Sequence, residues 1–157
     1  MNILEIELAI SRFFGVRQHL MVPNVSWGLG IHECDMLVVT KKGYANEVEI
    51  KLNKYDLKRD LNKNHGHRSR LIRRLFFAIP ESLLESQNFI PIHAGIIVVF
   101  NHNSMNFCKL IRPAVINKIA KPLTQEQLIH LGRLASMRIW SLKQSFLYRK
   151  EDEIFLA

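Results

Sequence analysis

The sequence predicts an α/β (α+β) fold in which a central mixed β-sheet is flanked by helices. Short apolar or alternating segments, typical of strands, fill the middle of the chain. Segments with apolar residues at helical spacing lie before, between and after those strands, which indicates a sheet covered on both faces. The expected order of elements is α-β-β-β-α-β-β-β-α. The 157 residues, 48% of them hydrophobic, are enough for a single domain over residues 1–157 with its own core.

The first helix is predicted over residues 3–14. Apolar residues recur there at helical spacing and form one stripe, made of Ile3, Ile6, Ile10, Phe13 and Phe14. On a helical wheel Glu7 falls within this stripe, whereas Glu5 falls on the opposite, solvent-facing side. A carboxylate among core-facing residues is costly unless it reaches water or a partner. Glu7 is therefore either an edge residue of the stripe or part of a polar site.

Three strands are expected next, because apolar and β-branched residues cluster there between glycine-containing turns. These strands cover residues 20–27, 34–40 and 44–52. A helix follows at residues 53–63, for which Asn53 is a suitable N-cap and Asp56 a favourable first-turn acid. The next segment, NHGHRS at 64–69, is expected to be a loop.

The second half of the chain predicts three more strands and a final helix. The strands are apolar runs at residues 74–80, 94–100 and 107–111. The final helix opens with a capping box from Thr124 to Gln127. Its apolar residues keep helical spacing through Leu128, Leu131, Ala135, Ile139, Leu142 and Phe146. Trp140 on the same helix is expected to pack in the core or to contact a second copy, so a homodimer is one expectation.

The predicted strand at 44–52 carries an unusual row of charges. Glu47, Glu49 and Lys51 alternate with apolar residues, so the three side chains share one face of the strand. A single E-x-K pattern is more often an exposed strand with incidental ion pairs than a functional site. The pairing of this strand and the charge of the segment after it favour a functional site here.

The turn before this strand decides which side chains lie opposite the charges. Residues 41–43, Lys-Lys-Gly, fit a three-residue hairpin loop whose glycine takes the left-handed position. In that register Asp35 lies directly opposite Glu49, with Cβ atoms about 4.5–5.5 Å apart. A two-residue loop would pair Asp35 with Ile50 and separate the two acids across the sheet. The three-residue loop is the expected one, although the sequence alone leaves both open.

Two directly opposed carboxylates repel each other unless a cation lies between them. A hard divalent ion such as Mg²⁺, or Mn²⁺ in its place, takes oxygen ligands and is often held by one or two carboxylates together with substrate phosphates. Lys51 stands two residues beyond Glu49 on the same face. Its ammonium could bond an attacking water or a phosphate oxygen. These groups together suit the hydrolysis of a phosphodiester.

The positive charge of the chain is concentrated directly after this row. The net charge is +8 and the sequence pI about 9.8. Residues 51–74 hold nine of the 22 Lys and Arg residues against two acids, and the rest of the chain is nearly balanced. A basic block is often only a solvated face, but beside opposed carboxylates it favours a surface that binds a polyanion.

The stretch from Cys34-Asp35 to Glu49-Ile50-Lys51 resembles the PD-(D/E)xK nuclease superfamily, in which an Asp on one strand precedes E-x-K on the next. Cys34 stands where the motif has Pro, a departure that many members share. The resemblance implies a restriction-endonuclease-like core over roughly residues 1–100, with a helix that carries a further Glu, three antiparallel strands, a helix and another strand. Within the superfamily, the chain looks most like small single-domain DNA-repair or phage-associated members.

The resemblance also implies a role for each motif residue. Asp35 and Glu49 would bind Mg²⁺, with the Ile50 carbonyl as a further ligand. Lys51 would orient or activate water, and Glu7 would be the acid that the first helix supplies. The function implied is that of a Mg²⁺-dependent DNA endonuclease in DNA repair, recombination or the processing of phage or mobile-element DNA. The alternative is a nucleic-acid-binding module that keeps the nuclease fold but has little catalytic activity.

DNA contacts are expected from the basic block and the loop within it. The residues are Lys54, Lys58, Arg59, Lys63, His65, His67, Arg68 and Arg70. His65 and His67 are assigned to phosphate or backbone contacts, because zinc would need further ligands that two distant cysteines do not supply.

Cytoplasmic localisation is expected, with no membrane partner. The N-terminal MNILEIEL is acidic and lacks the basic region of a signal peptide. The apolar run at residues 94–100 is far too short to cross a bilayer. Cys34 and Cys108 are expected to be reduced core residues rather than a disulfide.

Overall fold

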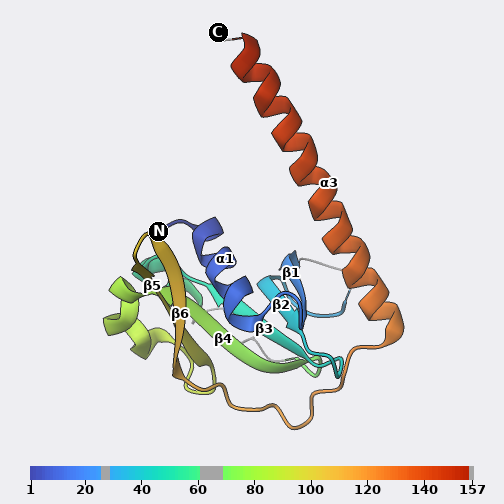
Figure 1. Cartoon of the computed structure of the whole chain (residues 1–157). Helices are drawn as coiled ribbons and strands as arrows, with labels where there is room; N and C mark the ends of the chain where they lie inside the picture. The colour runs from blue at the N-terminus through green and yellow to red at the C-terminus, as the bar shows by residue number, and fades with distance from the viewer. Residues whose placement is uncertain (26–28, 61–68, 156–157) are drawn as a thin grey trace.

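A six-stranded mixed sheet forms the centre of the computed structural model, which describes residues 1–25, 29–60 and 69–155 (Figure 1). The strands lie in sequence order and are β1 (Leu20–Val25), β2 (Cys34–Val39), β3 (Ala45–Ile50), β4 (Ile72–Pro80), β5 (Gly95–His102) and β6 (Met105–Arg112). The pairs β1–β2, β2–β3 and β5–β6 are antiparallel, whereas β3–β4 and β4–β5 are parallel. The predicted α+β class with a mixed sheet is confirmed.

Helices cover both faces of this sheet, as predicted (Figure 1). They are α1 (Ile3–Phe14), α2 (Lys54–Asp60), the 3₁₀ helix η1 (Glu81–Phe89) and α3 (Gln125–Phe155). On one face, α1 buries Ile6 and Ile10 in a cluster with Val48 of β3. On the other face, α2 contributes Leu57 to one cluster with β4 and β5, and the first turns of α3 contribute Leu131 to another with β1–β3. The sequence did not predict η1.

The predicted helix starts follow local capping signals. The Asn53 side chain accepts a hydrogen bond from the Asp56 backbone N–H at 2.9 Å and caps α2. Thr124 and Gln127 form the reciprocal capping box expected before α3: each backbone N–H donates to the side-chain oxygen of the other, at 2.9 and 3.2 Å. These bonds satisfy backbone donors that a helix start would otherwise leave without partners.

The hairpin between β2 and β3 has the register of the three-residue loop. Met36 pairs with Val48, and the ladder continues from there toward the turn. At the turn, the Gly43 backbone N–H donates to the Thr40 carbonyl at 2.8 Å. Gly43 has a φ of 79°, in the left-handed region that favours glycine. The two-residue alternative is therefore wrong, and the start of β2 lies beside the end of β3.

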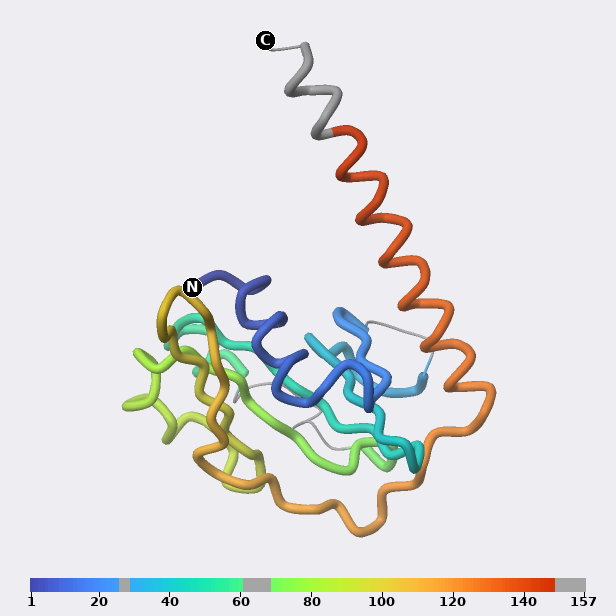
Figure 2. The backbone as a smooth tube through the Cα atoms, viewed as in Figure 1, coloured from blue at the N-terminus to red at the C-terminus, as the bar shows by residue number. Residues whose placement is uncertain are grey.

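The last helix leaves the sheet partway along its length (Figures 1 and 2). Leu131 and Leu134 are buried against β1–β3. Farther along the same apolar stripe, Ile139, Leu142 and Phe146 are 55%, 58% and 63% exposed. The second half of α3 thus carries large apolar side chains that the described part of this chain does not cover.

Both cysteines are free, as predicted. Burial raises the pKa of the Cys34 thiol well above its usual value, and the nearby charges of Glu47 and Glu49 raise it further. Burial also raises the pKa of Cys108 to about 11. Both groups are therefore neutral thiols near neutral pH, which is typical of unreactive core cysteines.

Candidate active site

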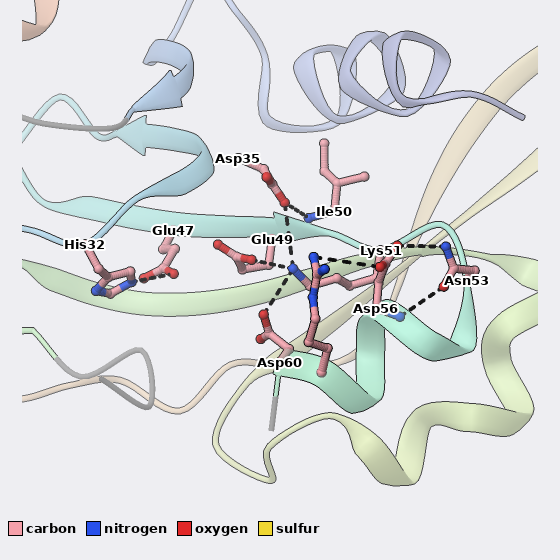
Figure 3. Close-up of polar contacts among 10 residues, drawn as sticks. His32, Asp35, Glu47, Glu49, Ile50, Lys51, Asn53, Asp56 and Asp60 are labelled. Atoms are coloured by element: carbon pink, nitrogen blue, oxygen red, sulfur yellow. Dashed lines mark hydrogen bonds and ion pairs between the residues drawn. The ribbon is translucent and has the colours of Figure 1, made fainter. Parts of the chain in front are cut away.

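A pocket of about 430 Å³ opens where the start of β2, the end of β3 and the inner side of α2 meet (Figure 3). Its lining residues are Glu33, Asp35, Glu49, Ile50, Lys51, Asp56, Arg59 and Asp60. Five of these eight are acids and two are bases, so the pocket carries a net negative charge. Asp35, Glu49 and Lys51, which the sequence motif singled out, therefore line the same pocket.

Lys51 lies at the centre of this pocket. Its ammonium nitrogen is 2.6 Å from Glu49 Oε2, 3.2 Å from Asp60 Oδ1 and 4.0 Å from Asp35 Oδ2 (Figure 3). The same nitrogen lies 5.9 Å from the centroid of the Phe77 ring, on the neighbouring strand β4. Carboxylates from two strands and one helix therefore hold one ammonium in place.

The charge state of Lys51 follows from these contacts. Burial lowers the pKa of the ammonium, but the charges of Glu49, Asp60 and Asp35 and the hydrogen bond to Glu49 outweigh burial and raise it above its usual value. Lys51 is therefore a cation near neutral pH. It can donate hydrogen bonds and stabilise negative charge, but it has no free lone pair with which to accept a proton.

Asp35 stands at the mouth of the pocket. The paired ladder between β2 and β3 ends at Met36 and Val48. One step beyond, the Asp35 carboxylate reaches across to β3 and accepts a hydrogen bond from the Ile50 backbone N–H at 2.7 Å. Its side chain is 32% exposed, whereas that of Glu49 is 2% exposed. The two acids thus line one pocket at different depths, with Asp35 nearer to solvent.

Glu7 of α1 is electrostatically coupled to Asp35. Burial raises the pKa of Glu7, and the charge of Asp35 raises it further, so the two carboxylates are close enough to repel each other. Glu5 has a different role, since its carboxylate accepts a hydrogen bond from the Asn2 backbone N–H at 2.7 Å and completes the cap of α1. Of the two helix acids, Glu7 is the one that senses the charge of Asp35, although it does not itself line the pocket.

Asp60 is the pocket residue that the sequence reasoning missed. It is 7% exposed, at the end of α2, and its carboxylate contacts Lys51. The signal that could have found it is its spacing from Leu57, because residues three apart share one side of a helix and Leu57 is apolar. An acid on the buried side of α2 needs a cation as a partner, and Lys51 is that cation.

Glu47 belongs to a separate pair in the interior. Its side chain is fully buried, and Glu47 Oε1 lies 2.7 Å from His32 Nε2 (Figure 3). Neither residue lines the acidic pocket. The predicted row of three charges is therefore divided, because Glu49 and Lys51 point into the pocket whereas Glu47 pairs with the segment before β2. His32 was not predicted, although a carboxylate on so apolar a strand calls for a polar partner.

The predicted DNA-binding residues on α2 lie near the pocket but differ in orientation. Lys54 and Lys58 hold their ammonium groups over the ring of Phe89 in η1, at 5.7 and 5.2 Å from its centroid. Arg59 lines the pocket itself, and its side chain is 72% exposed. Arg59 is therefore the base of α2 that is best placed to meet a substrate at the pocket.

The remaining predicted DNA contacts are elsewhere. Arg70 lines a different pocket, together with Arg73 and Arg74, at the beginning of β4. Four others lie outside the described residues: Lys63, His65, His67 and Arg68. The basic block is continuous in the sequence. Among the described residues, however, its two ends lie at two different pockets.

The donor set of the pocket suits Mg²⁺ rather than a softer metal. Asp35 and Glu49 offer hard carboxylate oxygens, and Ile50 lines the same pocket. Over the described ranges, no group of three or more His, Cys, Asp or Glu side chains is arranged to enclose a metal ion. Mg²⁺ does not need such a cage, because it commonly keeps several waters and takes one or two carboxylates. The ammonium held among the acids shows that this place stabilises positive charge.

The fold and the pocket define an α+β protein with a mixed six-stranded sheet and an acidic pocket where β2 and β3 meet. The chain belongs to the MmcB-like family of DNA repair proteins, whose model matches residues 2–145. A solved structure of similar fold is the SPO1766 protein of unknown function from Silicibacter pomeroyi, with a TM-score of 0.62 and 15% sequence identity. The match covers 92% of this chain and 90% of the other.

A comparison with curated proteins gave no significant match. None of the helices in the described part of the chain combines the length and hydropathy needed to cross a membrane.

Proposed function

We propose that this protein is a Mg²⁺-dependent DNA endonuclease that acts in DNA repair. The observation that carries the proposal is the convergence of Asp35, Glu49 and Lys51 on one pocket, in the order used by the PD-(D/E)xK nuclease superfamily. The order of elements from α1 to β4 is also the order that this superfamily implies. Membership in a family of DNA repair proteins supports DNA as the substrate.

Asp35 and Glu49 are the residues that would hold Mg²⁺, with the Ile50 carbonyl, next to Glu49 on β3, as a third donor. Bound there, the ion would supply Lewis-acid stabilisation of phosphate charge and a more acidic water. Arg59 at the rim would attract the phosphate backbone toward the pocket.

The role proposed for Lys51 is electrostatic. Its ammonium remains charged because Glu49 and Asp60 surround it, so it would donate a hydrogen bond to the attacking water or to a phosphate oxygen. A positioned cation opposes the negative charge that builds up in the transition state, which is a large contribution in a partly buried site. Asp60 would act through Lys51 by holding the ammonium in position.

Glu7 is the carboxylate best suited to handle a proton. Its raised pKa makes it a stronger proton acceptor than an ordinary glutamate near neutral pH. Its place beside Asp35 would bring that acceptor close to water at the mouth of the pocket.

Cleavage of labelled DNA tests the proposal. Purified protein should cut DNA in Mg²⁺ and not in EDTA, and Asp35→Asn should remove the activity while the protein stays folded. A panel of duplex, flap, junction and single-stranded substrates would identify the preferred structure. Absence of cleavage on every member of the panel, with DNA binding retained, would favour the alternative of a binding module with the same fold.

A further inference from the structure

Two basic pockets lie at the opposite end of the sheet from the acidic pocket. One has a volume of about 500 Å³ and the other about 380 Å³, and Arg73 and Arg74 line both. Arg70 adds a base to the first pocket, and Lys41 and Lys42 of the hairpin turn add two to the second. None of the described residues that line either pocket is acidic. We call these five bases the Arg73–Arg74 site.

These bases are available to an anion. Within the described residues, none of the five forms an ion pair with a carboxylate. The Arg73 guanidinium lies 3.9 Å from the centroid of the Tyr44 ring. Contact with the ring restricts the motion of the guanidinium, and a guanidinium can bind a phosphate with two hydrogen bonds.

The site is built on rigid backbone. The Asn117 side-chain amide donates to the carbonyls of Ser69 and Ile72 at 3.0 and 2.9 Å. The Asn117 backbone N–H donates to the Arg73 carbonyl at 2.9 Å, which ties the chain after β6 to the start of β4. On the other side, the Leu123 N–H donates to Gly43 at 2.8 Å and holds the hairpin turn. The bases therefore project from anchored segments.

The distance to the acidic pocket follows from the register of β3 and β4. Arg74 pairs with Asn46, and Phe77 pairs with Glu49. Arg74 therefore lies three residues before the position of Glu49 along these parallel strands. At about 3.3 Å per residue this is roughly 10 Å along the strands. The Lys41–Lys42 turn lies farther still from Glu49, before the start of β3. A duplex that rises 3.4 Å per base pair spans such a separation in about three to six base pairs.

We infer that the Arg73–Arg74 site is a second binding site for the phosphate backbone of DNA, separate from the acidic pocket. It holds a part of the DNA several nucleotides away from the phosphate at Glu49. The identity of the ligand as DNA rests on the proposed function, whereas the preference for a polyphosphate rests on the uncompensated bases themselves. Two separate contacts favour DNA long enough, or branched enough, to reach both.

The test is the salt dependence of DNA binding, measured in EDTA so that no cleavage occurs. The probe is a labelled duplex of about 30 base pairs, which can reach both sites. Lys41→Gln/Lys42→Gln changes two exposed side chains of the turn, and Arg74→Gln changes the pocket itself. Each lost phosphate contact should lower affinity and flatten the log–log slope by about 0.9. Arg74→Lys should restore most of the slope.

The matched control is Arg133→Gln/Lys143→Gln, which removes two exposed bases of α3 and should leave the slope unchanged. The inference is overturned if the Lys41/Lys42 and Arg74 variants, with melting temperatures like that of the wild type, keep the wild-type slope. It is also overturned if the α3 control flattens the slope equally. A flattened slope in a protein that never cleaves DNA would refute the nuclease and keep the second site.

Discussion

The ammonium of Lys51 lies 2.6 Å from the Glu49 carboxylate, two residues away on β3. Both side chains are almost completely buried, and Asp60 holds the same ammonium from α2. Any cation that Glu49 binds must therefore share this carboxylate with Lys51. We therefore expect substitution of a residue that binds the ion to have a different effect from substitution of Lys51, which supplies positive charge to the reaction.

Lys51→Met should slow DNA cleavage by about 10²–10³-fold, which is the scale for losing one preorganised donor. Methionine has a similar length, so the space over Phe77 stays filled. DNA affinity in Ca²⁺ should change little, because many other bases remain. Single-turnover cleavage and equilibrium binding measure the two effects. Lys109→Met, which removes an exposed lysine of β6, is the control. A wild-type rate for Lys51→Met would mean that Lys51 has no catalytic role.

Asp35→Asn should abolish both cleavage and stabilisation by Mg²⁺. The amide oxygen of asparagine can still accept the hydrogen bond from Ile50, so the fold should persist, and in EDTA the variant should be at least as stable as the wild type. For the wild type, Mg²⁺ at 100 times its Kd should add about 2.7 kcal/mol to the free energy of unfolding. Thermal unfolding with Mg²⁺ and with EDTA checks this. An equal Mg²⁺ shift in both proteins would place the ion elsewhere.

His32→Ala should destabilise the fold without touching the pocket. The change leaves the buried carboxylate of Glu47 without its imidazole, and removal of one partner of a buried pair costs about 3–5 kcal/mol. The double change His32→Leu/Glu47→Leu should recover most of this loss, because it removes both polar groups. Urea unfolding measures both variants. If the double variant were as unstable as His32→Ala, the pair would not act as a unit.

Glu7→Gln should change how stability depends on pH. A raised pKa means that folded Glu7 keeps its proton where the unfolded chain has lost it, so stability falls as pH rises above the ordinary value of 4.5. Glutamine has no proton to lose in this pH range, so the variant does not lose stability in this way. In EDTA, Glu7→Gln should therefore melt at a higher temperature than the wild type above neutral pH and at the same temperature below pH 4.5. Glu85→Gln, at an exposed position of η1, should show neither effect.

A second copy of the chain is the expected cover for the distal half of α3. Its exposed large apolar side chains are Met137, Ile139, Trp140, Leu142, Phe146, Leu147 and Tyr148. Ile139, Leu142 and Phe146 lie on one side of the helix, so a second copy packed along that side would cover them. Ile139→Glu/Phe146→Glu should convert a dimer into a folded monomer in sedimentation experiments, and Ser136→Glu should not. A monomeric wild type would remove this expectation.

Local spacing explains which parts of the site could be predicted. The position of Gly43 determines the hairpin register, and the register brings Asp35 to the end of β3, where its carboxylate accepts a hydrogen bond from the Ile50 N–H. Asp60 and His32 escaped prediction because their contacts depend on how neighbouring segments pack onto β3, which no short pattern encodes. Packing also decides where the basic block lies: the crossover through α2 carries the chain back to the start of β4, so Arg70 lies at the opposite end of β3 from Lys51.

The β2–β3 turn also bears on the order in which the molecule folds. Asp35 and Ile50, which share a hydrogen bond, are only 15 residues apart in the chain, and contacts of such short separation form on the microsecond scale of hairpins. The parallel pairing of Glu49 with Phe77 closes a longer loop and comes later. We therefore expect the acids of the pocket to come together before α2 brings Asp60 to Lys51. In that order their mutual repulsion would add to the folding barrier, and a divalent cation bound early would lower it.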